Sequence, residues 1–532
     1  MMAGALALAA PLPALAQTGS PIDRQRADRA PPQAIPFGRD TPNAATRVEA
    51  GDEAAPPIRN IHFEGVNVPM VVARAAQPFV GRPANRANLQ ALAAAMSEAY
   101  GRSEVALFTI VIPEQDLAAG DVRVLVAEGH LETVALTGEV EGRPLRLVRA
   151  YANRLIGGHP TRRATLERYL SLIRDIPGLT VRTSLQTGNE PGGVTMILAL
   201  DYTRPTLSLS FDNRTTRLVK DGQFSARARG YGLIREGDET ELNGVASVDF
   251  NDLLYVGFIH STPIGTEGTR LSLNAGYLVT RPPSTGIRGE ATAFGLTLSH
   301  PLIRSYRRNL TLSLSLDGLN SKNAAFGSLI SSERTRAIRA AAVYAQVWPR
   351  RALSAALTLS RGLDIAGARI PAVIGQPDFT KLNGRVGLDQ AIGRRAVLRL
   401  RAAGQFTRDP LPAAERFSVG GADYGRAFET GLINADRGAA ALGELAFRPV
   451  RAGRFAASEI YGFADYAAVR VLPRPGFAGQ DFHLASAGAG LRIAWTDKAM
   501  LEFEAARTLE RPYPAYPSDW RFSIAWRINF RP

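Results

Sequence analysis

The chain has no cysteine and, after its first residues, no long apolar run. The lack of cysteine in 532 residues excludes disulfides, thiolate metal sites and cysteine nucleophiles. A membrane-spanning helix needs ~18 or more consecutive apolar residues, and no such segment occurs. If the protein enters a membrane, a closed β-barrel is the remaining option, because the lipid interior offers no hydrogen-bond partner to an open backbone.

The sequence also lacks the usual motifs of nucleotide and metal chemistry. It contains no Gly-Lys dipeptide, which excludes a phosphate-binding P-loop. The six histidines are scattered and form no HExxH pair, and no acid pair stands in a glycosidase or protease frame. We therefore expect no catalytic residues, no metal and no cofactor, with a barrel enzyme such as an outer-membrane lipase or protease as the alternative.

Lysine is scarce, so the formal net charge of +14 comes almost wholly from arginine. The arginines are spread along the chain and often alternate with apolar residues. No basic run is interleaved with stacking aromatics, which argues against nucleic-acid binding. The distribution favours solvated loops and a polar lumen.

The last segment, residues 520–530 (WRFSIAWRINF), alternates strictly between large apolar and smaller or polar residues. Successive strand side chains point to opposite faces, so the segment has one apolar and one polar wall. This pattern is typical of a bacterial outer-membrane strand, although a strand over a soluble core is the alternative. The apolar wall consists of Trp520, Phe522, Ile524, Trp526, Ile528 and Phe530.

From Pro205 onward, segments of period two replace helical patterns, as in 206–211 (TLSLSF) and 310–316 (LTLSLSL). An even number of strands of ~9–11 residues suits an outer-membrane barrel. We predict sixteen strands, starting near residues 205, 222, 239, 252, 269, 288, 308, 335, 351, 379, 394, 438, 454, 484, 498 and 519. One connection, at about 407–437, is far longer than the others, and loops of this length are usually functional or disordered.

Two units with the same order of elements precede the predicted barrel. The first has a strand at 58–66, helices at 70–78 and 85–100, and strands at 105–112 and 121–128. The second has a strand at 131–136, helices at 144–156 and 162–174, and strands at 179–185 and 193–201. Apolar residues at helical spacing support both second helices. The pattern predicts two β-α-α-β-β domains, at 58–129 and 130–203, followed by a barrel at 204–532.

The first 57 residues are predicted to lie outside these domains. Residues 1–16 (MMAGALALAAPLPALA) have the apolar core and A-x-A cleavage pattern of a signal peptide. The positive segment that normally precedes such a core is missing, so we expect the true start to lie upstream. Residues 17–57 are rich in Pro, Ala, Asp and Arg, which predicts a flexible linker or a possible plug segment.

The long connection contains a Gly-Gly turn, a central arginine and flanking aromatics over residues 415–428. We expect it to fold inward if Arg426 meets an acid on the lumen side of the barrel. Asp465 is the candidate, because it is a charge within a predicted strand, and a bidentate Arg–Asp pair would hold the loop in one place. An external loop with a solvated arginine is the alternative.

These segments resemble the two-partner secretion transporters (TpsB), the haemolysin secretion/activation ShlB/FhaC/HecB family of the Omp85 superfamily. Residues 113–129 (PEQDLAAGDVRVLVAEG) resemble the end of its first POTRA domain, and residues 172–181 (LIRDIPGLTV), with Leu185 and Gly188, resemble its second POTRA domain. The loop motif of the family, Phe-x-Val-Gly-Gly before Val-Arg-Gly-Tyr/Phe, departs here at Gly425 and Ala427. Its matching residues are Phe417, Val419, Gly420, Gly421, Arg426 and Phe428. Phe463 and Asp465 match its Phe-x-Asp motif on the barrel wall.

The resemblance implies two periplasmic POTRA domains and a sixteen-stranded outer-membrane barrel with an inward loop whose arginine contacts the wall acid. It implies a secreted exoprotein partner, such as an adhesin or haemolysin, that passes through the barrel without ATP. Strand 105–112 and the second helix of the first unit are the candidate capture surfaces. Outer-membrane lipid, lipopolysaccharide and, during biogenesis, the barrel-assembly machinery are the other expected partners.

Two other functions stay open from the sequence. An assembly factor for other barrels shares the superfamily's domains, but typically carries three or more POTRA domains. A passive porin needs no β-α-α-β-β units, so residues 58–203 argue against it.

Overall fold

The computed structural model describes residues 46–50, 56–216, 219, 221–282, 286–326, 328–450 and 452–530. The predicted signal peptide and most of the predicted linker lie outside these ranges. The chain forms two compact units, an N-terminal one and a barrel, which are described separately. None of the helices in the described ranges is long and apolar enough to span a membrane.

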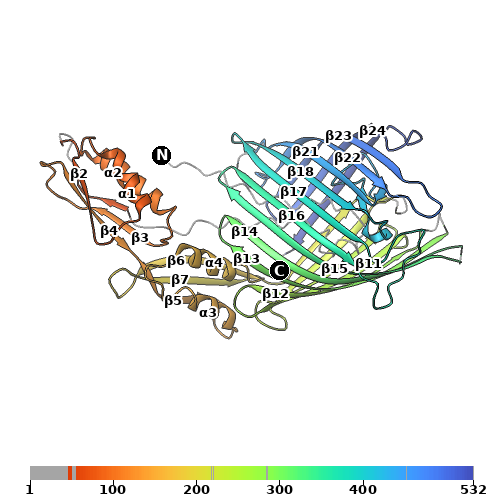
Figure 1. Ribbon diagram of the computed structural model, residues 1–532, viewed down its shortest axis with the longest axis horizontal. Helices are drawn as coiled ribbons and strands as arrows, with labels where there is room; N and C mark the ends of the chain where they lie inside the picture. The colour runs from red at the N-terminus through yellow and green to blue at the C-terminus, as the bar shows by residue number, and fades with distance from the viewer. Residues whose placement is uncertain are drawn as a thin grey trace. The chain divides into compact units, whose positions relative to one another are not determined.

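The first α+β region is a four-stranded sheet covered by two helices (Figure 1). Buried residues of the second helix, including Leu89, Leu92 and Met96, pack on alternating residues of the sheet such as Ile110 and Val124. The sheet order is β1-β3-β4-β2. The elements are β1 Thr46–Val48, β2 Asn60–Glu64, α1 Met70–Ala76, the 3₁₀ turn η2 Gln77–Phe79, α2 Arg86–Tyr100, β3 Phe108–Ile112 and β4 Asp121–Glu128.

Strand β1 lies within the segment that the sequence predicts to be a linker. It pairs in parallel with β3, with Thr46 opposite Ile110 and Val48 opposite Ile112. Three residues are too few for a periodic pattern, which is why sequence analysis missed this strand. The described part of the predicted linker therefore contributes to the first sheet.

The second α+β region has the order β5-β7-β6 and repeats the first without an added strand, within the residues described. Its core joins Leu166, Leu170 and Ile173 of the second helix to Met196 and Leu198 of the sheet. The elements are β5 His130–Gly138, α3 Arg146–Asn153, α4 Arg163–Arg174, β6 Leu179–Thr187 and β7 Gly193–Tyr202.

One arginine joins the two α+β regions. The guanidinium of Arg163 donates to the backbone carbonyls of Tyr100 (3.1 Å), Ser103 (3.0 Å) and Val105 (2.8 Å). These three residues lie at the end of α2 and just after it. The N–H of Ala106 donates to Thr161 O at 2.9 Å. These contacts tie the start of α4 to the end of α2.

Replacing Arg163 by alanine is expected to loosen this junction. Hydrogen bonds to a charged donor contribute about 1.5–3 kcal/mol, so amide hydrogen exchange of residues 101–107 should rise about tenfold or more. Hydrogen exchange with mass spectrometry measures the change. Arg162→Ala, at the exposed neighbouring position, is the control and should leave exchange unchanged, whereas equal exchange in both variants would show that Arg163 does not hold the junction.

The second unit is a closed barrel (Figure 1). It has sixteen antiparallel strands, and β25 pairs with β8. This confirms the predicted fold class. The strands are β8 Thr206–Asp212, β9 Gln223–Tyr231, β10 Glu239–Ser247, β11 Leu253–Ile264, β12 Thr269–Thr280, β13 Ile287–Arg304, β14 Arg308–Ala325, β15 Ser328–Trp348, β16 Arg351–Gly362, β17 Thr380–Ile392, β18 Ala396–Thr407, β21 Arg437–Phe447, β22 Glu459–Val471, β23 Gln480–Trp495, β24 Ala499–Glu510 and β25 Trp520–Phe530.

Strand starts differ from the prediction mainly at β15, which begins at Ser328 and not near residue 335. Its first residues, SLISSER, lack apolar alternation, yet they continue the pairing with β14 as far as Ser328 opposite Ala325. Backbone pairing therefore extends this hairpin beyond the part of the strand that the apolar pattern marks. Smaller shifts occur at β22 and β23.

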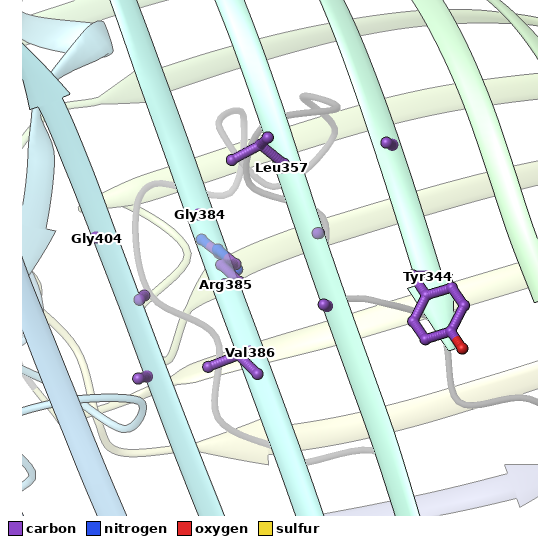
Figure 2. A pocket seen from close by; sticks show the side chains of 11 residues that line it. Tyr344, Leu357, Gly384, Arg385, Val386 and Gly404 are labelled. Carbon is purple, nitrogen blue, oxygen red and sulfur yellow. The ribbon is translucent and has the colours of Figure 1, made fainter. Parts of the chain in front are cut away.

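The barrel wall has an apolar outer face, as the alternation of the last strand predicts. Trp520 and Phe522 are exposed, whereas Ser523 and Ala525, which follow them on the opposite face, are buried. A hollow of about 530 Å³ lies on this face over β15–β18, between Leu357 and Val386 (Figure 2). It is lined mainly by alanine, glycine and aliphatic residues, so it follows from small side chains in the wall and offers little for polar recognition.

Candidate functional site

The long connection between β18 and β21, residues 408–436, is here called the lumen loop. It contains the 3₁₀ turn η3 Ala413–Glu415 and a two-stranded hairpin formed by β19 Phe417–Val419 and β20 Ile433–Ala435. The loop therefore has secondary structure of its own, which its irregular sequence pattern does not reveal.

The lumen loop packs against the polar face of the wall. Val419 and Phe428 are buried in one cluster with Leu442 of β21 and Phe463 of β22. In β22, Phe463 alternates with exposed apolar residues such as Ile460 and Tyr466, which belong to the outer face. Phe463 thus points into the barrel, and the loop that covers it lies in the lumen.

Glycines with positive φ let the lumen loop turn tightly. Gly420 and Gly421 both have φ +98, and a Cβ on Gly420 would lie 2.3 Å from the carbonyl oxygen of Glu429. Gly425 also has a positive φ, of +80, whereas Ala427 is outside this region. Only glycine adopts such angles without steric cost. In this chain the turn beside the arginine is therefore made before it, at Gly425, and the alanine after it is unstrained.

Asp465 of β22 holds the tip of the lumen loop through its backbone. Its carboxylate accepts the N–H of Gly425 (2.9 Å) and the N–H of Arg426 (3.2 Å). The hydroxyl of Ser486 donates to both carboxylate oxygens at 2.8 Å and accepts the N–H of Ala427 at 3.3 Å. Asp465 is 5 % exposed, so these hydrogen bonds form in a largely water-free environment, where they are strong.

The side chain of Arg426 has partners other than the predicted one. Its guanidinium forms ion pairs at 3.0 Å with Glu444 of β21 and with Glu504 of β24. It also lies 4.5 Å from the ring centre of Phe463. The predicted bidentate pair with Asp465 is therefore replaced by two separate carboxylates, because Asp465 is already engaged with the loop backbone.

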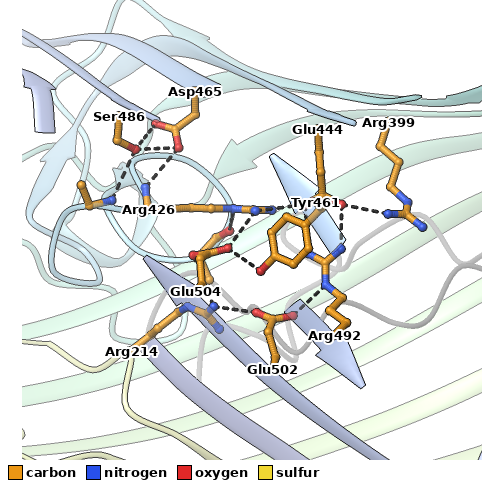
Figure 3. A network of polar contacts seen from close by, with 12 residues as sticks. Arg214, Arg399, Arg426, Glu444, Tyr461, Asp465, Ser486, Arg492, Glu502 and Glu504 are labelled. Atoms are coloured by element: carbon orange, nitrogen blue, oxygen red, sulfur yellow. Dashed lines mark hydrogen bonds and ion pairs between the residues drawn. The ribbon is translucent and has the colours of Figure 1, made fainter. Parts of the chain in front are cut away.

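The pair of acids around Arg426 belongs to a larger charged network (Figure 3). Opposite charges alternate through it, and cation–aromatic contact adds to it where Arg492 lies 3.7 Å from the ring centre of Tyr461. Buried charges are stable only when they are paired in this way. The further pairs are Glu444 with Arg399 and Arg492, Glu459 with Arg399 and Arg448, Glu502 with Arg492 and Arg214, and Glu504 with Arg214 and the hydroxyl of Tyr461.

A second anchor, which sequence analysis missed, lies at the base of the lumen loop. Glu415 is completely buried and contacts Arg339 of β15 at 3.0 Å and Lys381 of β17 at 2.8 Å. Arg339 also pairs with Asp317 of β14 at 2.6 Å. A signal was available, since Lys381 is one of four lysines in the chain and alternates with apolar residues in a strand.

Asp436 closes the other end of the lumen loop. It is completely buried, accepts the N–H groups of Leu411 (2.8 Å) and Leu472 (2.6 Å), and pairs with Arg474 at 2.6 Å. Glu415, Asp436 and Asp465 thus hold the loop at its start, end and tip. All three contacts lie on the inner side of the barrel.

The connection from β8 to β9 meets the lumen loop at the seam of the barrel. The hydroxyl of Thr430 donates to Arg214 O at 2.9 Å. The neighbouring Asn213 extends the seam beyond the end of β8, because its Oδ1 accepts the N–H of Ile524 at 2.9 Å and its N–H donates to Ile524 O at 3.2 Å. Loop, network and seam are therefore in direct contact.

Two family models match the chain. One, for haemolysin secretion/activation protein ShlB/FhaC/HecB, covers residues 201–493. The other, for a ShlB-type POTRA domain, covers residues 57–129. The chain belongs to the ShlB/FhaC/HecB family. The family resemblance that the motifs predict is thus confirmed.

A relative of similar sequence and solved structures of similar fold were also found. The heme/hemopexin transporter protein HuxB of Haemophilus influenzae is 22% identical over 451 residues, which cover 81% of this chain and 79% of HuxB. The fold is similar to that of CdiB from Escherichia coli, with a TM-score of 0.69 at 19% identity over 90% of this chain and 91% of CdiB. It is also similar to BamA from Haemophilus ducreyi lacking POTRA domains 1–3, with a TM-score of 0.55 at 14% identity over 90% of this chain and 100% of that one.

Family membership confirms the predicted class of function. The protein is an outer-membrane transporter of the two-partner secretion type, with POTRA domains on the periplasmic side, and it is not an enzyme. In the described ranges no group of three or more His, Cys, Asp or Glu side chains could hold a metal ion. Which residues of the lumen loop matter for transport stays a prediction.

Proposed function

We propose that this transporter captures one dedicated exoprotein in an unfolded, extended form on its POTRA domains and passes it through the barrel to the cell surface. The observation that carries the proposal is the pair of β-α-α-β-β regions, each with a helix beside a strand at or near a sheet edge. A sheet edge binds any extended chain through backbone hydrogen bonds, and an adjacent helix adds selectivity for side chains. Folding of the exoprotein outside, without nucleotide hydrolysis, gives the transport its direction.

The lumen loop shapes the passage in this proposal. It lies on the inner face of the barrel and is fixed by buried acids at its tip and at both ends. A polypeptide that passes through the barrel must pass beside this loop or displace it. The motif residues around Arg426 therefore set the width of the passage by fixing the position of the loop.

The other proposed partners of the barrel are inferred from its outer surface and from its last strand. The outer apolar face contacts lipid and lipopolysaccharide, and the aromatic last strand addresses the barrel to the assembly machinery. Transport by this barrel requires no nucleic acid, cofactor or metal.

Deleting residues 57–202 is expected to abolish secretion of one large exoprotein and to leave other outer-membrane barrels at normal abundance. Proteomics of the culture supernatant and of the outer membrane, for wild type and deletion, measures both quantities. As a control for assembly, the barrel of the deletion variant must itself be detected in the outer membrane. A broad fall in unrelated barrels would indicate an assembly factor, and no change in either fraction would indicate a porin.

A further inference from the structure

Strand β1 occupies the sheet edge that an extended exoprotein segment would use in the first POTRA domain. It runs parallel to β3, with the N–H of Glu49 donating to Ile112 O at 2.9 Å beyond the last paired residue. On its other side it contacts α2. The edge of β3 and the groove beside α2, which sequence analysis identifies as the capture surface, are thus already filled by the chain itself.

The side chains of this segment alternate as those of a bound peptide do. Thr46 Oγ1 lies 2.9 Å from Ser97 Oγ of α2, Val48 packs on the core, and Ala50 is 4 % exposed within it. Between them, Arg47 and Glu49 form an ion pair at 2.7 Å on the solvent side. The groove therefore selects small or β-branched residues at every second position and leaves the others free.

The second POTRA domain shows that the fold is complete without this strand. Its strand β6 corresponds to β3, being the first strand after the two helices. Within the described residues, the sheet of that domain ends at β6. Both domains have a closed hydrophobic core, so β1 adds an occupant to an edge that the second domain leaves uncovered.

We propose that residues 46–50 are a displaceable internal occupant of the capture site in the first POTRA domain, which the exoprotein must replace before transport. The inference rests on the proposed function and adds a regulatory step to it. A tethered segment competes at high effective concentration, so weak or incidental chains are excluded. The replacing segment is an extended peptide with small or β-branched residues at positions i, i+2 and i+4.

The chain has no cysteine, so one engineered disulfide can lock the occupant in place. In Thr46→Cys/Ser97→Cys the two sulfurs replace hydroxyls that are already in contact, and the periplasm allows the bond to form. We expect secretion of the exoprotein to fall at least tenfold in the locked full-length protein and to recover when cells are treated with a reducing agent. Each single cysteine variant is a control, and barrel assembly is checked by heat-modifiable electrophoresis.

The outcomes separate the two proposals. Normal secretion by the locked protein would overturn the displacement of β1, although the proposed function would stand. Absence of any secreted exoprotein in wild type would contradict the proposed function itself. If the locked variant fails to assemble, binding of a peptide to the purified protein tests the displacement of β1 instead.

A peptide probe tests the same site without secretion. Glu49→Pro removes the N–H that bonds to Ile112 O, so it should release the occupant. We expect a fluorescent peptide of residues 44–52 to bind the purified full-length Glu49→Pro protein at least tenfold more tightly than wild type. Arg47→Ala, which changes an exposed side chain of the same strand, is the matched control and should bind as wild type does. Equal binding to all three proteins would show that β1 is a permanent part of the sheet.

Discussion

Arg426→Ala is expected to reduce secretion of the exoprotein at least tenfold while the barrel still assembles in the outer membrane. The substitution removes the cation that joins the lumen loop to Glu444 and Glu504 and the contact with Phe463. Breaking a buried charge pair costs about 3–5 kcal/mol. The acids keep other arginine partners, so we expect the wall to stay folded and the side-chain anchor of the loop tip to be lost.

Two further variants make this prediction specific. Arg426→Lys keeps the charge but loses the planar guanidinium, and intermediate secretion is expected. Arg408→Ala, at an exposed position at the start of the same loop, should secrete normally. The amount of exoprotein in the supernatant, divided by the amount of folded transporter, is the quantity to compare. Wild-type secretion by Arg426→Ala would show that the position of the loop tip does not control transport.

Glu415→Ala is expected to lower the stability of the barrel. It leaves two completely buried cations, Arg339 and Lys381, without the carboxylate that bridges them. Asp317 still pairs with Arg339, so what is lost is the bridge between the two cations. Removing one member of such a cluster costs about 3–5 kcal/mol, and we expect the thermal transition of the detergent-solubilised barrel to fall by several degrees.

The heat-modifiable gel shift and circular dichroism both follow that transition. Asp519→Ala, which removes an exposed acid in the connection before β25, is the control and should leave it unchanged. Glu415→Gln separates the effect of the charge from the effect of side-chain size, since it keeps the size and loses the charge. A transition at the wild-type temperature in Glu415→Ala would mean that the two cations find other partners and that the base of the loop is not held by Glu415.

The barrel could be predicted from sequence because lipid imposes a simple rule on every strand. Apolar residues on the outer face alternate with polar ones, and the regular starts of β8 to β14 follow that pattern. The alternation is imposed only where a strand faces lipid. The first residues of β15 do not alternate in this way, so the sequence pattern did not predict them. The hairpin within the lumen loop escaped this pattern as well, since β19 and β20 lie inside the barrel, away from lipid, and are only three residues long.

The candidate site was located from sequence, but its contacts were not. Matching motifs brought Arg426 and Asp465 to one place, yet nothing in the sequence indicates whether a carboxylate accepts from a guanidinium or from a backbone N–H. Glu444 and Glu504 lie in strands whose relative register determines which acids reach the arginine. Such register is a property of the folded wall and cannot be obtained from separate segments.

The seam between β8 and β25 has a consequence for the timing of assembly. It pairs the first and last strands of the barrel, with Leu207 opposite Phe530. Most other strand pairs in the described part of the barrel join strands that follow each other in sequence. Contacts between distant segments form late, because a long chain must be closed to make them. The edge of β8 that faces away from β9 therefore stays unpaired until β25 is in place. The hydrogen bonds between Asn213 and Ile524 form in that same step. Closure of the barrel and formation of the contact between Asn213 and Ile524 are then a single, late step of folding.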